Sequence, residues 1–311
     1  MSDTTTTTST PGAVQTTGHA WDGDLQEFNN PLPRWWLWSF YATVVFAVFY
    51  WFAYPAWPFG KTWTKGFTTA TYTEGGQSHT MRWNTRSALL EDLDSGSDAK
   101  RQRQYLDKIA QTDYAAIAKD PQMVAFVNQA GKRLFETNCS ACHGRGGQGV
   151  VGLFPNLVDD DWLWGGSYQA IETTLKHGRN GYMPAFGSVL NATQIDDVAN
   201  YVLSLSGVVP SSEASARGQK IFTGATGGCY MCHGDDGKGI KSMGAANLTD
   251  KIWTIANVPA AQSPADKLAA VRAVIGNGVQ NVRKMPAWGE RLSAAEIKLM
   301  AVYVHQLGGG Q

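Results

Sequence analysis

Two short motifs of identical form constrain this chain more than any other feature of its sequence. They are Cys139-Ser-Ala-Cys142-His143 and Cys229-Tyr-Met-Cys232-His233. The Cys-x-x-Cys-His pattern attaches c-type haem, because two thiols at this spacing bond the two vinyl groups while the next imidazole reaches the iron. The chain has 4 cysteines, so none remains for a disulfide, and no further ligands at zinc spacing or thioredoxin-like strand context accompany the pairs. The sequence therefore predicts two covalently bound haem c groups.

A methionine followed by proline lies downstream of each motif, as Met183-Pro-Ala-Phe186-Gly and Met285-Pro-Ala-Trp288-Gly. A thioether as the sixth iron ligand stabilises reduced iron and raises the potential. Repetition in register favours Met183 and Met285 as axial ligands, opposite His143 and His233, over methionines that only fill a core. His177 is the main rival ligand in the first copy, but Asn277 stands near its place in the second, so we expect His177 to be a loop or propionate neighbour.

The two haem motifs lie within a longer repeat. Ala130-Gly-Lys-Arg-Leu-Phe135 precedes the first motif and Ala216-Arg-Gly-Gln-Lys-Ile-Phe222 precedes the second, while a helical segment ending in Tyr201-Val or Tyr303-Val closes each copy. The pattern predicts a mainly α fold with two tandem domains, 123–208 and 213–308. The second copy is longer between its cysteines and its methionine, and Pro259 and Pro264 indicate that a surface loop within 254–267 holds the insertion.

An uncharged run from Trp35 to Tyr54 predicts one transmembrane helix, over 34–56. About 20 residues at about 1.5 Å each span the roughly 30 Å of a bilayer core, and aromatic residues stand at both ends of the run. A buried core helix fits the length and aromatic content less well, and a cleaved signal peptide would need a basic segment before the run. Residues 1–33 are then a cytoplasmic tail, partly disordered over the Thr-rich 1–16, and 57–122 a periplasmic linker with short extended and helical pieces.

Basic residues argue weakly against this orientation, since Arg34 stands alone before the helix while Lys61 and Lys65 follow it. Bacterial c-type haem is attached outside the cytoplasmic membrane, and we expect this constraint to prevail. The haem domains then lie in the periplasm of a single-pass protein of the bacterial inner membrane. The chain has 26 basic and 26 acidic residues and no polybasic tract, so nothing suggests binding to nucleic acid.

Glycine-rich segments follow both haem motifs, at 144–149 and 234–239. No strand precedes them and no Gly-Lys-Ser/Thr occurs, so they are expected to be turns over a haem edge rather than phosphate loops. The tryptophans of the two copies either pack on the porphyrins or donate an indole N–H to propionates, and packing is the expected role; these are Trp162, Trp164, Trp253 and Trp288.

The two repeats resemble class I cytochrome c domains. The N-terminal stretch Thr17-Gly-His-Ala-Trp21-Asp-Gly23 through Glu27-Phe-Asn-Asn30-Pro-Leu-Pro33-Arg34-Trp-Trp36, with Tyr54-Pro-Ala-Trp57-Pro58 after the anchor, is similar to the dihaem subunit, subunit III, of cbb3-type cytochrome c oxidases. The resemblance implies that Cys139, Cys142, His143 and Met183 hold the first haem. It implies that Cys229, Cys232, His233 and Met285 hold the second.

The resemblance also implies the partners. They are a catalytic haem-copper subunit, a monohaem cytochrome c subunit and a soluble periplasmic cytochrome c that donates electrons. The complex would be a proton-pumping, O2-reducing enzyme, whereas this chain would be its electron-transfer subunit, with no catalytic residue of its own. Two alternatives remain: an electron-transfer subunit of another respiratory complex, or a membrane-anchored dihaem peroxidase in which one iron lacks its sixth ligand. A haem-based sensor is a weaker third, because no transmitter domain accompanies the repeats.

Overall fold

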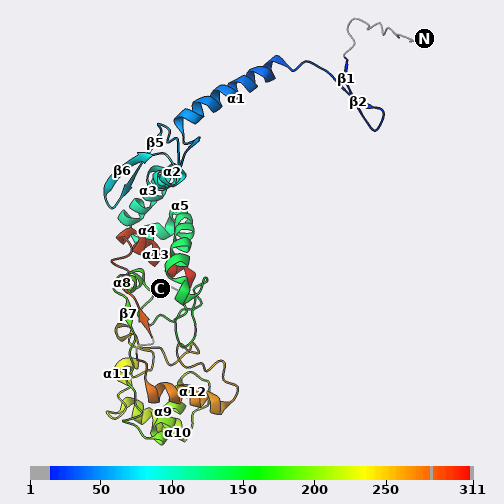
Figure 1. The fold of residues 1–311 in the computed structure, drawn as a ribbon. Coiled ribbons are helices and arrows are strands. Elements are labelled where there is room, and N and C mark those ends of the chain that lie inside the picture. The colour runs from blue at the N-terminus through cyan, green and yellow to red at the C-terminus, as the bar shows by residue number, and fades with distance from the viewer. Residues whose placement is uncertain (1–14, 281–282, 309–311) are drawn as a thin grey trace, which may run out of the picture. The chain divides into compact units, whose positions relative to one another are not determined.

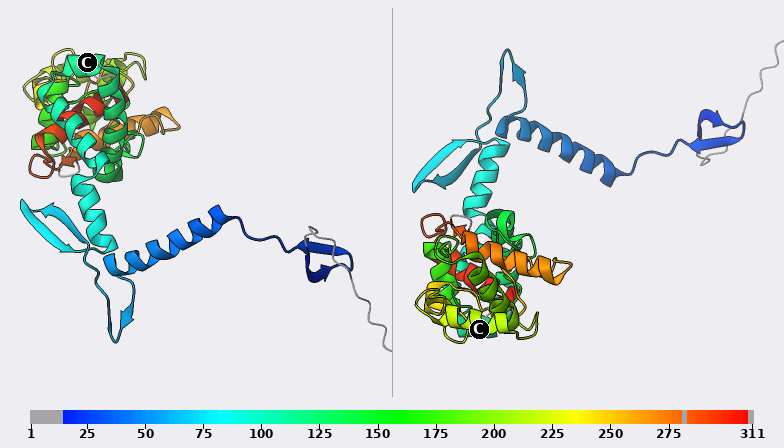
Figure 2. Two further views of the ribbon diagram at one scale, coloured as in Figure 1. Left: turned by 90° about the horizontal axis from the view of Figure 1, so that it is seen from above. Right: turned by 90° about the horizontal axis from the view of Figure 1, so that it is seen from below.

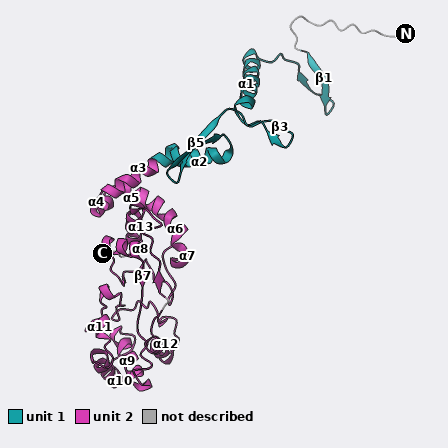
Figure 3. Cartoon of the chain, turned by 60° about the vertical axis from the view of Figure 1, so that its left-hand side comes forward, with its two compact units in different colours: residues 1–100 teal, residues 101–311 magenta. Residues whose placement is uncertain are grey.

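The computed structural model describes residues 15–280 and 283–308, and helices dominate it (Figure 1). The chain forms two compact units, residues 1–100 and 101–311 (Figure 3). Most of the Thr-rich segment predicted to be disordered, residues 1–14, lies outside the described residues. The mainly α fold with one apolar N-terminal helix and two cytochrome c repeats is confirmed.

The first unit combines one long helix with three hairpins, which Figure 2 shows as separate two-stranded ribbons. The first hairpin, absent from the prediction, falls in the tail before the anchor. The elements are β1 (Thr16–Trp21), β2 (Leu25–Phe28), α1 (Arg34–Ala53), β3 (Pro58–Phe59), β4 (Thr62–Trp63), β5 (Thr69–Glu74), β6 (Gln77–Arg82) and α2 (Thr85–Ser95).

Helix α1 is long and apolar enough to cross a membrane, and most of its side chains are exposed in the structure. It ends three residues before the predicted limit, because Pro55 forces Tyr54 into an extended conformation. The carbonyl oxygen of Ala53, left without a partner in the last turn, accepts hydrogen bonds from Phe67 N at 3.1 Å and Thr68 Oγ1 at 2.7 Å. The approach requires glycine at residue 66, where φ is +62° and a Cβ would collide with that carbonyl.

The second unit contains both haem motifs. Its elements are α3 (Ser97–Gln111, which begins in the first unit), α4 (Tyr114–Lys119), α5 (Pro121–Phe126), η1 (Val127–Gly131), α6 (Lys132–Asn138), α7 (Ser140–His143), α8 (Tyr168–His177), β7 (Arg179–Asn180), α9 (Ala192–Leu205), α10 (Glu213–Thr223), α11 (Tyr230–His233), η2 (Lys241–Met243), α12 (Pro264–Asn277), β8 (Lys284–Met285) and α13 (Ala294–Leu307).

Part of the extra length of the second repeat is helix rather than loop. Helix α12 has 14 residues where its counterpart α8 has 10. Pro264, expected in a surface loop, is the first residue of α12, where its missing N–H costs nothing, and Ser263 caps the helix through a capping box. Pro259 does lie in the preceding loop.

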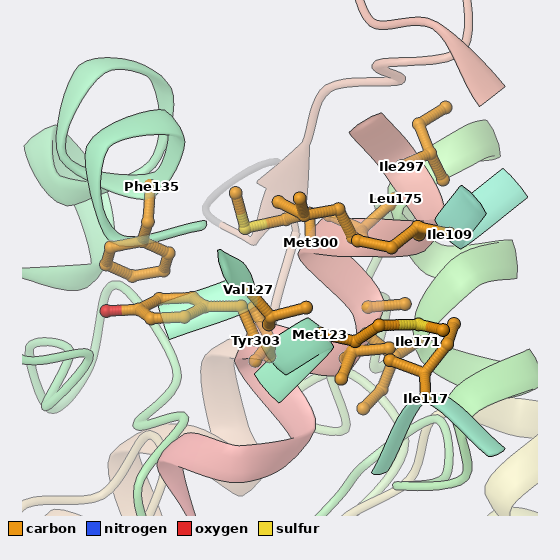
Figure 4. Packing of buried hydrophobic residues seen from close by; sticks show 14 residues of the cluster. Ile109, Ile117, Met123, Val127, Phe135, Ile171, Leu175, Ile297, Met300 and Tyr303 are labelled. Carbon is orange, nitrogen blue, oxygen red and sulfur yellow. The ribbon is translucent and has the colours of Figure 1, made fainter. Parts of the chain in front are cut away.

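Two separate hydrophobic cores divide the second unit into nested halves. One core draws its residues from 106–175 and 285–307, including Ile109, Phe135, Leu175 and Met300 (Figure 4). The other lies entirely between Met183 and Ile275. We call 101–180 plus 283–308 the outer half and 183–279 the inner half. Figure 1 shows this arrangement: α13, in red, lies among the green helices of the outer half, and orange α12 lies beside α9 and α10.

Helix crossings show the same exchange between repeats. In the outer half, Gly131 of η1 packs on Tyr303 of α13, whose Cβ would be 2.8 Å from an added Cβ. In the inner half, Gly218 of α10 packs on Tyr201 of α9, with the two Cβ positions 2.9 Å apart. Each repeat's early helix therefore pairs with the last helix of the other repeat. The domains expected at 123–208 and 213–308 follow the sequence repeats, whereas the two hydrophobic cores each combine helices of both repeats.

The chain passes between the halves at a short crossing of extended segments. Strands β7 and β8 pair antiparallel, with Arg179 opposite Met285, and Met183 and Val279 form a bridge with two hydrogen bonds of 2.9 Å. The loops of both predicted methionine ligands thus lie at this crossing. Gly278 sits against the Met183–Ala185 backbone and Gly178 against the Met285–Ala287 backbone, each with positive φ.

Candidate haem-binding site

One continuous cavity of about 810 Å3 lies in the second unit, and mainly apolar side chains line it. All of the predicted site residues border it: Cys139, Cys142, His143, Met183, Cys229, Cys232, His233 and Met285. The position, size and apolar lining are those of a site for a large, flat, hydrophobic cofactor. His177, in contrast, is exposed at the end of α8 and is not among the lining residues, so the structure does not place it as an iron ligand or a propionate neighbour.

Each motif histidine is fixed by a backbone carbonyl on the far side of its ring. Nδ1 of His143 lies 3.0 Å from the carbonyl oxygen of Pro155, and Nδ1 of His233 lies 2.9 Å from that of Ala246. Because a carbonyl oxygen only accepts, Nδ1 carries the proton in both rings and Nε2 keeps its lone pair for a metal. Burial lowers the pKa of both histidines, which further favours the neutral, ligating form.

The glycine-rich turns explain how these carbonyls reach the histidines. Gly149 N donates to His143 O, and Gly239 N donates to His233 O, both at 2.8 Å. Both glycines have positive φ, and a Cβ at Gly149 would lie 2.5 Å from the carbonyl oxygen of Pro155, the same atom that faces His143. The segments predicted as turns over a haem edge therefore bring the backbone carbonyl that orients each histidine close to that histidine.

The first cysteine of each motif is largely buried, and burial disfavours its ionised form. Burial raises the pKa of Cys139 and of Cys229 to about 11, so neither is a thiolate near neutral pH. A free thiolate would suit zinc or redox chemistry, whereas here each pair stands beside a neutral histidine on a short helix at the wall of an apolar cavity. The residues fit a covalently attached porphyrin. Bound haem supplies one-electron redox chemistry at iron.

The methionines lie in different halves from those expected by sequence order. Met285 packs against the outer core, together with Cys139, Leu157 and Trp162. Met183 packs against the inner core, together with Leu248 and Trp253. Packing thus groups Met285 with the first cysteine motif and Met183 with the second, opposite to the pairing implied by the resemblance. The sequence does not distinguish the two groupings, because the two loops are identical over Met-Pro-Ala.

Two family models match the chain. The model described as the N-terminal domain of cytochrome oxidase-cbb3, FixP, matches residues 13–61, and the model for cbb3-type cytochrome c oxidase subunit III matches 127–202 and 213–304. The chain belongs to this family. Its two matched repeats coincide with the two haem motifs, and its N-terminal match covers the hairpin and the apolar helix.

Curated relatives match over nearly their whole length. The cbb3-type oxidase subunit FixP of Azorhizobium caulinodans is 44% identical over 310 residues, covering 96% of this chain and 95% of the relative. The subunit CcoP of Cereibacter sphaeroides is 41% identical, covering 97% of each chain, and FixP of Bradyrhizobium diazoefficiens is 42% identical, covering 95% of each. The family identifies the chain as a membrane-anchored c-type cytochrome of electron transport and a subunit of a cbb3-type oxidase.

Proposed function

We propose that this chain is a dihaem relay that accepts electrons from a soluble periplasmic cytochrome c and passes them to a monohaem cytochrome c subunit. That subunit would feed a haem-copper subunit that reduces O2. The observation that carries the proposal is the single cavity bordered by two complete sets of haem residues, in a chain of this family. A continuous cavity lets the two haems approach without intervening protein layers, which suits direct electron transfer.

The ligand sets follow the packing. Cys139 and Cys142 would hold the outer haem, with His143 and Met285 as axial ligands. In the inner half, Cys229 and Cys232 would hold the second haem, with His233 and Met183 as axial ligands. Both irons would then be closed on each face, which favours electron transfer over binding of O2 or peroxide.

Helix α1 would anchor the chain in the inner membrane, with both haem halves in the periplasm, where c-type haem is attached. In this arrangement a soluble donor reaches the second unit directly. The apolar side chains of α1 are exposed in the isolated chain, so lipid or the helices of other oxidase subunits would cover them. Oxygen reduction and proton pumping would belong to those subunits.

The relay is tested by purification in mild detergent, identification of co-purifying subunits, and optical and EPR spectra. A haem-copper subunit and a monohaem cytochrome, together with two low-spin c haems on this chain, are expected. A chain that purifies with another respiratory enzyme would contradict the assigned partner. A high-spin haem that binds peroxide would contradict the relay and support the peroxidase.

The exchanged ligands are tested separately by NMR of the reduced chain with labelled methionine methyl groups. The methyl group of an iron-bound methionine lies over the porphyrin, so its dipolar contacts identify the haem it faces. Contacts from Met285 to the haem bound at Cys139 and Cys142 are expected. Contacts from Met183 to that haem would restore the sequence-order pairing and leave the relay itself intact.

A further inference from the structure

Polar atoms without partners mark one wall of the haem cavity. Among the described residues, Arg283 Nη2, Trp162 Nε1 and Asp161 Oδ2 are buried and have no hydrogen-bond partner. All three residues line the cavity. A buried polar atom without a partner destabilises the folded state, more so when it is charged, so such an atom indicates that a ligand or water satisfies it.

Arg283 is placed at the crossing between the two halves. Its carbonyl oxygen accepts from Gly181 N at 2.9 Å, and it stands two residues before Met285. Its guanidinium borders the cavity, and it lies near enough to Asp161 in the outer half for its charge to oppose the rise in the pKa of that carboxyl group. A residue of the second repeat thus places a positive charge near residues of the first repeat on the cavity wall.

Asp161 does not serve as the partner of Arg283. It forms an ion pair with Lys241, whose Nζ lies 3.8 Å from Oδ1, while Oδ2 has no hydrogen-bond partner. Because no hydrogen bond satisfies Arg283 Nη2, this buried donor is available to a carboxyl group of a ligand in the cavity. Haem has two such carboxylates, its propionates, at one edge of the ring.

We propose that Arg283 and Trp162 together bind a propionate of the haem attached at Cys139 and Cys142, and that Arg283 thereby raises the potential of that haem. The inference rests on the proposed function, since it requires the haem. A guanidinium offers two parallel N–H donors to a carboxylate, and the indole N–H adds a third. A positive charge beside the ring favours reduced iron, because the reduced site carries one positive charge fewer than the oxidised site, and the potential rises as a result.

The test is a redox titration of the full chain in detergent, with Arg283→Gln compared with Arg272→Gln. Arg272 is a matched control, because it pairs with Asp196 at 2.7 Å and does not line the cavity. In Arg283→Gln the potential of the outer haem is expected to fall while that of the inner haem stays unchanged. The outer haem is identified as the one whose potential Met285→His lowers. Arg283→Lys, which keeps the positive charge, is expected to keep most of the natural potential.

Asp161→Asn separates this role from a purely structural one. Above about pH 7, where this carboxyl group is ionised, its removal is expected to raise the same potential, opposite to the effect of Arg283→Gln. Equal potentials in Arg283→Gln and Arg272→Gln would overturn the inference, as would shifts of the same sign in Arg283→Gln and Asp161→Asn. A chain that attaches no haem, or whose haems do not titrate reversibly, would instead overturn the proposed function.

Discussion

The crossing of α9 and α10 offers a sensitive test of the nested packing, through the substitution Gly218→Ala. A Cβ at this position would lie well inside contact distance of the Asp197 carbonyl oxygen and 2.9 Å from Cβ of Tyr201. The obstacle is backbone, so the helices must move apart, and overpacking of this kind costs about 1–3 kcal/mol. The higher helix propensity of alanine offsets up to about 1 kcal/mol of this loss. We expect a net loss of about 1–2 kcal/mol.

Gly276→Ala is the matched control, because Gly276 is also helical and its added Cβ would meet no atom within 4 Å. This variant should gain about 0.5–1 kcal/mol from helix propensity alone. Urea unfolding of the full chain in detergent, followed by circular dichroism and haem absorption, measures both. Equal stability of the two variants would refute the close crossing.

A double-mutant cycle then identifies the partner helix. If α10 crosses α9, Tyr201→Gly removes the Cβ that an alanine at residue 218 would meet, so this change costs less in the Gly218→Ala background than in the natural chain. Tyr303→Gly, the equivalent change on α13, should cost the same in both backgrounds, since Tyr303 packs on Gly131 instead. Coupling to Tyr303 rather than Tyr201 would refute the nested arrangement.

Two further predictions concern the halves. Residues 181–280, expressed as a fragment and exported for haem attachment, should show the optical spectrum of a methionine-ligated low-spin haem. Residues 209–308, a complete sequence repeat without α9, should not show it. The opposite pair of spectra would contradict the ligand exchange. Burial, aided by Asp250 and Asp159 and opposed by Lys241 and Arg283, raises the pKa of Asp161 from 3.8 to about 6, so the folded chain holds a proton that the unfolded chain releases. The stability that this proton contributes is complete below about pH 4 and is lost as the pH rises through about 6. Over that range the urea midpoint of Asp161→Asn should therefore rise relative to that of the natural chain. Parallel pH profiles of the two midpoints would contradict the raised pKa.

The sequence was sufficient for features that depend on local chemistry. The cysteine motifs, the Met-Pro loops and the uncharged run each carry their meaning within a few residues, and the structure places the residues of the first two at one cavity. The hairpin at 16–28 escaped prediction, because its two strands are short and exposed on both faces, although Asp22 and Gly23 adopt the positive φ of a tight turn. Arg283 also stood out in no pattern, since only burial reveals that a guanidinium lacks a partner.

The exchange of helices could not be predicted, because the last helices of the two repeats share the same motif, Ile195 to Tyr201-Val and Ile297 to Tyr303-Val. Gly131 and Gly218 each allow a close approach of the opposing helix, and the tyrosine that approaches has the same place in both of these motifs. What distinguishes the pairings is distance along the chain. Helices α9 and α10 are joined by the short segment 206–212, so their contact forms with little loss of chain entropy, whereas a tandem arrangement would separate them.

The nested arrangement costs chain entropy in the outer half, because its last helix, α13, is far along the chain from the helices that it contacts. The crossing of extended segments reduces this entropy cost. The ends of the inner half are bonded to each other through Met183 and Val279, so the folded inner half acts as a short closed loop between β7 and β8. The outer half then closes as if α8 and α13 were near in sequence. Because both methionine loops lie at this crossing, iron ligation in either half would stabilise the strands that join them. The geometry between the two haems would thus be fixed by the fold, rather than left to a flexible linker between independent domains.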